Sequence, residues 1–207
     1  MVITYLGTGF IKVTFGETVI ALNPTSKEFN GKSARFGADV VLVSAPLPAF
    51  AGVEGLTGGG KEPFVIDGPG EYEHSDIFIK GYPSAGPAGT VNTIYSFLLE
   101  GMRVVSLGAL ATADLASEII EDISGADILI VPTGAEDSLA GRLAGKLASA
   151  LDPKIIIPVL HEGLKSAGLK EFMDEAGEPA GGAQDKLSLK KKDLEGKEAE
   201  VVVLEAI

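Results

Sequence analysis

The feature of this sequence that most constrains its fold is a change in hydrophobic period near residue 110. Before that point, short runs rich in β-branched and aromatic residues, such as 10–15 and 18–22, alternate with glycine-containing turns. This alternation predicts strands joined by tight turns. After that point, apolar residues recur at helical spacing over 113–123 and 136–151, which predicts helices. The two patterns together exclude a long helical bundle and favour a fold that combines strands with helices.

Continuously apolar runs separate the predicted helices and also occur in the first half. The run at 39–44 is of this kind, which predicts a strand covered on both faces. Further strands are predicted at 2–6, 63–66, 77–80, 93–99, 103–107, 127–131, 154–158, 186–189 and 200–204, a third helix at 164–176, and loops at 23–37, 45–60 and 81–89. We therefore expect an α/β (α+β) sandwich in which two mixed sheets pack face to face with helices outside.

The length of 207 residues suits one domain. We expect that domain to span 1–207, with a β-rich half at about 1–100 and an α/β half at about 101–207. The basic run 190–192 has acidic residues close by and is read as a solvated turn rather than a binding patch.

Charge and composition narrow the classes of partner. The 17 basic and 29 acidic side chains give a net charge of −12, which repels nucleic-acid phosphates and anionic membrane surfaces. Cysteine is absent, so disulfides and thiolate metal sites are excluded. No apolar run approaches the roughly 20 residues that span a bilayer, and the N-terminal residues lack the basic region of a secretory signal. We expect a cytoplasmic protein that binds neither nucleic acid nor membrane.

Four strings resemble those of a known superfamily. They are Ile-Thr-Tyr-Leu-Gly at 3–7, Ala-Asp-Val-Val-Leu-Val-Ser at 38–44, Glu-Pro-Phe-Val-Ile-Asp-Gly-Pro-Gly-Glu-Tyr-Glu at 62–73, and Lys-Ile-Ile-Ile-Pro at 154–158. Their order resembles the metallo-β-lactamase-fold superfamily, in particular its small zinc-dependent-hydrolase, ascorbate-lactonase-like subgroup. The resemblance implies an αββα fold and, in the family, hydrolysis assisted by two zinc, iron or manganese ions.

The resemblance also implies where the metal ligands should be. The family carries His-x-His-x-Asp-His after the first long strand, and imidazole and carboxylate groups on that loop converge on two cations. Further ligands follow later strands. The matching positions in this chain hold no ligating side chain: Ala45, Leu47, Ala49, Phe50, Ala85, Ala109 and Leu160. Thr8 and Asn23 replace two other site residues of the family. This chain is therefore identified as a degenerate member, in which no group remains to hold the ions.

The apolar residues at the ligand positions predict an interior that differs from the metal-binding pocket of the family. Apolar side chains avoid the cost of burying unpaired polar groups and fill space, so we expect Leu47, Phe50 and Leu160 to close part of the family's pocket. We expect no cofactor and no metal. The leading hypothesis is a non-catalytic scaffold, ligand-binding or regulatory protein. Its partner would be a small molecule or a protein that the sequence does not name, and it could form a homo-oligomer.

A second hypothesis keeps an enzyme. His161 follows the late strand and lies one place from the family's last histidine, so His161 with Glu162 could form a rebuilt mononuclear or metal-independent hydrolase site. The sequence favours the alternative, in which His161 is a polar residue at the end of a strand and has no catalytic role. His74 lies among three carboxylates. We interpret this segment as a solvated hairpin turn rather than a relocated metal site. A serine hydrolase using Ser44, Ser84 or Ser106 is disfavoured because the chain has no Gly-x-Ser-x-Gly elbow.

Overall fold

The computed structural model describes residues 1–30, 35–60, 62–179 and 181–207. The predicted loop 23–37 therefore lies partly outside the described residues. The strands are β1 (Val2–Tyr5), β2 (Ile11–Phe15), β3 (Thr18–Leu22), β4 (Val40–Leu42), β5 (Phe64–Ile66), β6 (Gly70–His74), β7 (Ile77–Ala85), β8 (Val91–Leu99), β9 (Met102–Ser106), β10 (Ile128–Pro132), β11 (Ile155–Val159), β12 (Leu187–Ser188) and β13 (Glu200–Val201). The helices are α1 (Lys27–Asn30), α2 (Ser117–Ile123), α3 (Gly141–Ala150) and α4 (Ala167–Ala176), with 3₁₀ turns at Val53–Gly55, Gly58–Gly60, Pro87–Gly89 and Lys191–Leu194.

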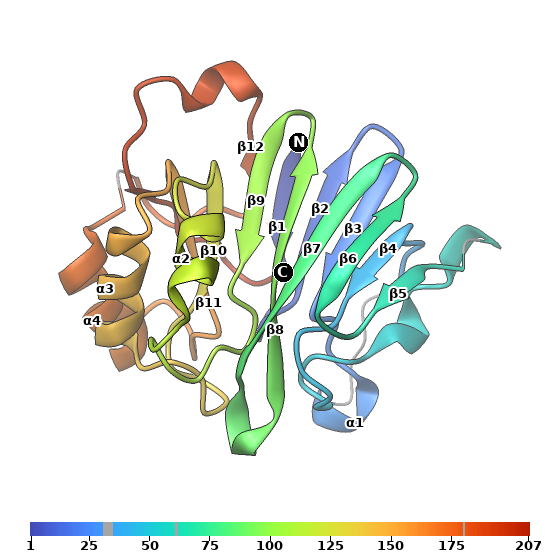
Figure 1. Ribbon diagram of the computed structural model, residues 1–207, viewed down its shortest axis with the longest axis horizontal. Coiled ribbons are helices and arrows are strands. Elements are labelled where there is room, and N and C mark those ends of the chain that lie inside the picture. Colours follow the sequence, from blue (N-terminus) through green and yellow to red (C-terminus); the bar gives the residue numbers. More distant parts are fainter. Residues whose placement is uncertain (31–34, 61, 180) are drawn as a thin grey trace.

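The strands form two mixed sheets, which confirms the predicted fold class. One sheet has the order β12-β1-β2-β3-β4-β5, and the other has the order β13-β11-β10-β9-β8-β7-β6. In the second sheet, β9, β10, β11 and β13 are parallel to one another, whereas β6 to β9 form an antiparallel meander. Alternate side chains from both sheets meet in one core, including Ile3, Tyr95 and Phe97. The sheets therefore pack face to face (Figure 1).

The outer faces of the two sheets are covered differently. A second apolar cluster joins the outer side of β9 to β11 to helices α2, α3 and α4, with Ile123, Leu147 and Phe172 among its buried members. A third cluster on the outer side of the first sheet combines Val41 with Leu56 from the 45–60 connection. The first sheet is therefore covered by connecting segments that contain only short helical pieces, and the longer helices lie on the second sheet.

Several predicted boundaries were wrong. The segment 81–89 was predicted to be a loop, but β7 continues to Ala85 because each residue from Gly81 to Ala85 has a cross-strand partner on β8. Pairing here overrides the local Gly and Pro composition. Helices α2 and α3 begin later than predicted. Glu136 and Asp137 have φ near +55°, so they form a turn before α3.

No helix in the described part of the chain is long and apolar enough to cross a membrane.

Candidate functional site

The positions that match the family's metal ligands lie mostly in the core between the sheets. Ala45, Ala49, Phe50, Ala109 and Leu160 are buried in one apolar cluster, and Leu47 is partly buried against it. A Cβ atom placed on Gly9 would lie 3.4 Å from the Phe50 ring and 3.6 Å from Leu160 Cγ. Phe50 and Leu160 therefore cover the same glycine turn, as expected for an apolar filling. Ala85 differs, because it is exposed at the end of β7.

Two buried asparagines hold the loops around this filling. Asn23 Oδ1 accepts the Ser44 N–H at 2.8 Å. Asn92 Oδ1 accepts the Ala109 N–H at 2.7 Å, and its amide donates to the Leu107 carbonyl at 3.0 Å. These bonds satisfy backbone groups that water cannot reach. The loops after β4 and β9 are therefore fixed by hydrogen bonds within the protein.

The side chains at these positions do not fit a metal ion. Alanine, leucine and phenylalanine have no lone pair to donate, and a transition-metal site needs several nitrogen, oxygen or sulfur ligands. Among the described residues, no group of three or more His, Asp or Glu side chains is placed to hold an ion. The metal chemistry that the family implies therefore has no donor set at these positions.

The backbone around the filling is strained at three non-glycine residues. Thr8, Asn23 and Leu160 have φ of 54°, 50° and 54°. Side chains disfavour this left-handed region, and such strain gathers at functional sites. The Leu160 N–H donates to the Thr8 carbonyl at 2.8 Å, which ties two of these residues together. The loops that carry Thr8 and Leu160 are therefore held together in this strained geometry.

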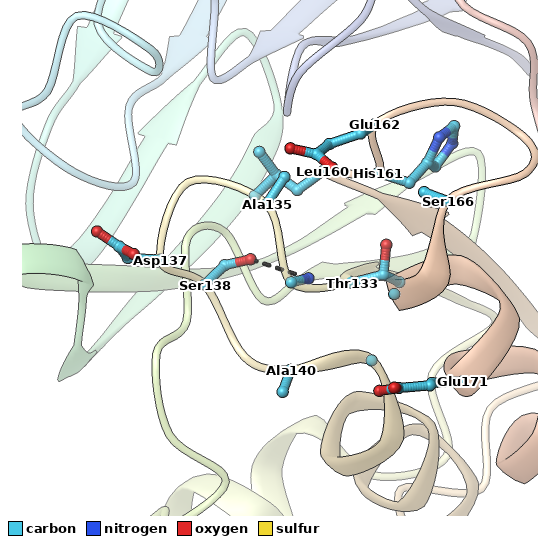
Figure 2. Close-up of a pocket in the computed structure, with 13 residues that line it drawn as sticks. Thr133, Ala135, Asp137, Ser138, Ala140, Leu160, His161, Glu162, Ser166 and Glu171 are labelled. Atoms are coloured by element: carbon cyan, nitrogen blue, oxygen red, sulfur yellow. Dashed lines mark hydrogen bonds between the residues drawn. The ribbon is translucent and has the colours of Figure 1, made fainter.

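A polar cavity of about 500 Å³ lies next to Leu160, between the loops that follow β10 and β11 (Figure 2). Thr133, Ser138 and Ser166 contribute hydroxyl groups to its lining. Asp137, Glu162 and Glu171 contribute carboxylates, and the lining contains no lysine or arginine. The cavity is therefore acidic. It favours neutral or cationic polar molecules and disfavours anions.

Two of the glycines that line this cavity allow close contacts between backbone segments. A Cβ atom on Gly141 would lie 2.0 Å from the Gly168 carbonyl oxygen, and a Cβ atom on Gly168 would lie 2.2 Å from the Thr133 carbonyl oxygen. Only glycine allows such close backbone contact. The start of α4 is capped by Ser166, whose Oγ accepts the Leu169 N–H. The N-termini of α3 and α4 and the end of β10 are therefore held at the cavity.

His161 borders this cavity and a smaller one of about 300 Å³ beside Tyr5. Its ring centroid lies 5.2 Å from that of Tyr5. Both ring nitrogens are covered, and neither has a hydrogen-bond partner among the described residues. Burial lowers the pKa of His161 and so favours the neutral form of its ring. In Figure 2 the His161 ring and the Glu162 carboxylate point to opposite sides, so Glu162 does not orient the imidazole.

The other candidates do not assemble with His161. Neither cavity beside His161 is lined by Ser44, Ser84 or Ser106. Ser84 is bonded to Asn92 instead. His74 ends β6 and stacks on Phe64, with ring centroids 4.8 Å apart, so it lies at a hairpin turn.

Comparison with known families identifies the chain's superfamily. The model of the beta-lactamase superfamily domain matches residues 2–160, so the chain belongs to that superfamily. The match includes all seven positions discussed above and ends at Leu160. No curated protein sequence is a significant match.

Solved structures share the fold over 84% to 99% of this chain. A protein from Thermotoga maritima, described as a candidate Zn-dependent hydrolase of the metallo-beta-lactamase superfamily, is 26% identical with a TM-score of 0.76, and the match covers 98% of this chain and 97% of that one. Igni18, a metallo hydrolase from Ignicoccus hospitalis, is 16% identical with a TM-score of 0.64, covering 99% and 95%. The metallo-beta-lactamase fold protein YhfI from Bacillus subtilis is 13% identical with a TM-score of 0.60, covering 84% and 92%.

The cavity residues other than Leu160, His161 and Glu162 were missed by the sequence reasoning. Thr133, Ser138 and Ser166 belong to no short motif. One signal could have found them: they follow β10 and β11, and ligands of α/β proteins bind beyond the carboxyl ends of adjacent parallel strands.

Proposed function

We propose that this chain is a non-hydrolytic, ligand-binding member of the beta-lactamase superfamily. The observation that carries the proposal is the apolar core at the family's ligand positions, where Phe50 and Leu160 are fully buried against Gly9. Hydrolysis assisted by two metal ions needs several ligating side chains there. The acidic cavity beside Leu160 is the proposed binding site, and its ligand is a small neutral or cationic polar molecule.

The fold supports this role because strained loops and buried asparagines still surround the filled core. Binding requires a preformed cavity with a few polar groups, whereas hydrolysis also requires an activated nucleophile. A rebuilt hydrolase would rely on His161, the histidine that borders the cavity. Among the described residues, no side chain bonds to its ring nitrogens, whereas a general base of this kind uses an orienting partner. We therefore rank the binding role above the hydrolase.

The first test is an activity assay on the purified chain. Ester, lactone, β-lactam and phosphodiester probes are incubated with the protein, with and without a chelator. We expect no hydrolysis that depends on metal. Hydrolysis that stops when the chelator is added would contradict the proposal. Hydrolysis that persists in chelator but is abolished in His161→Ala would favour the rebuilt hydrolase.

The second test is binding to the cavity. Thermal shift is measured with a panel of primary amines, amino acids and sugars, and Ala140→Trp is used to fill the cavity from its rim. A matched control is Ala116→Trp, since both alanines are exposed, extended residues just before a helix. A compound that stabilises the wild type and Ala116→Trp but not Ala140→Trp supports the cavity as the binding site. Equal stabilisation of all three proteins places the binding elsewhere.

A further inference from the structure

The outer face of the second sheet is exposed over one end of β6, β7 and β8, whereas Tyr82 and Ile94 farther along β7 and β8 are buried in the cluster beneath the helices. Figure 1 shows no helix in front of these strands, whereas α2, α3 and α4 lie toward β10 and β11. Two large apolar side chains are exposed on this face: Phe78 on β7 is 61% exposed and Leu98 on β8 is 51% exposed. They border a groove of about 470 Å³ that also contains Tyr82 and Lys80. Exposed apolar side chains grouped in this way mark an interaction surface.

Strand pairing places these residues in one row across the sheet. Glu73 on β6 pairs with Phe78, and Leu98 pairs with Arg103 on β9. Ile79 pairs with Phe97 in the antiparallel β7–β8 ladder, so Phe78 and Leu98 are the next neighbours on the opposite face. The outer row thus reads Glu73, Phe78, Leu98, Arg103. An acidic residue stands at one end, a basic residue stands at the other, and two apolar residues lie between them.

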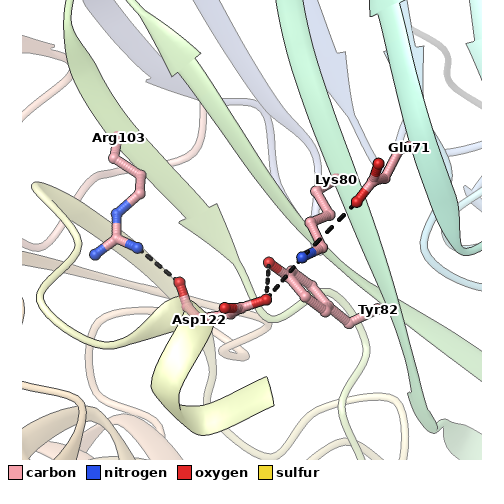
Figure 3. Close-up of polar contacts among 5 residues, drawn as sticks. All are labelled: Glu71, Lys80, Tyr82, Arg103 and Asp122. Atoms are coloured by element: carbon pink, nitrogen blue, oxygen red, sulfur yellow. Dashed lines mark hydrogen bonds and ion pairs between the residues drawn. The ribbon is translucent and has the colours of Figure 1, made fainter. Parts of the chain in front are cut away.

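The polar groups beside the row are electrically balanced. The Lys80 Nζ lies 2.7 Å from Asp122 Oδ2 and 3.9 Å from Glu71 Oε1. The Arg103 guanidinium donates to the carbonyl oxygen of Asp122 (Figure 3) and also to that of Ser124, and both are neutral acceptors. Two cations and two carboxylates therefore line this groove, in a chain of net charge −12. The groove is therefore close to neutral, so two copies repel each other less across it than the net charge of the whole chain would suggest.

We propose that the outer row is the interface of a homodimer. A two-fold axis parallel to the strands places the row of one copy across the row of the other in reverse order. Glu73 of each copy then faces Arg103 of its partner, and Phe78 faces Leu98. An isologous contact of this kind buries the apolar pair and sets opposite charges against each other. The row is complementary to itself, and this argues for a second copy of the chain as the occupant.

The first experiment measures mass by sedimentation velocity across micromolar concentrations. We expect the wild type to reach twice the chain mass of 21.3 kDa. Phe78→Asp and Leu98→Asp each place a carboxylate in the apolar centre and should weaken the dimer by about tenfold or more. Val91→Asp is the matched control, because Val91 is 57% exposed on β8 but lies outside the groove. A wild type that stays monomeric overturns the proposal, as does a dimer that survives both substitutions.

A second experiment tests the register of the row. Glu73→Arg sets two arginines against each other in each contact, and Arg103→Glu sets two glutamates against each other, so each variant alone should dimerise poorly. Mixed together, the two variants restore both opposite-charge contacts and should form a heterodimer. Thermal unfolding of each variant checks that the chain is folded. Failure of two folded variants to pair, when the wild type does dimerise, would overturn the two-fold arrangement.

Discussion

At the residue scale, the most informative feature is the apolar chemistry of the side chains at the positions that match the superfamily's metal ligands. Phe50 and Leu160 are fully buried where the superfamily resemblance places metal ligands, and both lie against Gly9. A buried imidazole or carboxylate without a metal would lose its hydration with no partner in return. An apolar residue at the same place gains from burial. Burial of Phe50 and Leu160 therefore stabilises the fold.

The contribution of this filling can be measured with Phe50→Ala. Removing a buried phenyl ring leaves a cavity and should lower the free energy of unfolding by about 3–5 kcal/mol. Phe15→Ala serves as the control, because Phe15 is 39% exposed and should cost much less. Chemical denaturation of both variants gives the comparison. Equal, small losses would show that Phe50 is not packed as described.

His161 makes the stability of the fold depend on pH. Burial lowers its pKa below the ordinary value of 6.5. The unfolded chain therefore binds a proton at a pH where the folded chain does not, and acidification below about 6.5 favours unfolding through this residue. We expect the melting temperature of the wild type to fall more steeply than that of His161→Phe as the pH drops from neutral toward 5. Parallel falls in both proteins would contradict a buried, neutral imidazole.

At the scale of elements, local pattern predicted the strands better than the helix starts. The run 18–22 is β3 as predicted, and Asp39–Ser44 contains β4. The extension of β7 to Ala85 could not be predicted, because it depends on pairing with β8 rather than on local residues. The starts of α3 and α4 depend on backbone contact between Gly141 and Gly168, which no periodicity reveals.

This backbone contact yields a prediction for the two helices. Gly168→Ala would place a methyl group 2.2 Å from the Thr133 carbonyl oxygen, so the start of α4 must shift. Such overpacking typically costs about 1–3 kcal/mol, or a few degrees in melting temperature for a chain of this size. Gly181→Ala is the control, since a Cβ there meets nothing within 4 Å. Calorimetry that shows equal melting temperatures for both variants would contradict the close contact.

At the scale of the whole molecule, the fold follows from membership of the superfamily, whereas the chemistry of the cavity depends on the particular side chains that line it. The two face-to-face sheets are the architecture of the superfamily, and a solved structure shares it over nearly the whole chain. The resemblance of a few strings was enough to predict it. The acidic cavity was not predicted, because its hydroxyl groups and carboxylates come from separate loops that only the folded chain brings together. Fold alone therefore does not fix activity here.

The absence of a bound metal ion is tested most directly by the metal content of the purified, untagged protein. Cells are grown with added zinc, iron and manganese, and the protein is analysed by inductively coupled plasma mass spectrometry. We predict a metal content far below one ion per chain and no thermal stabilisation when these ions are added. A content close to one or two ions per chain, lost together with stability in a chelator, would contradict this prediction and would place a metal site among residues that we read as non-ligating.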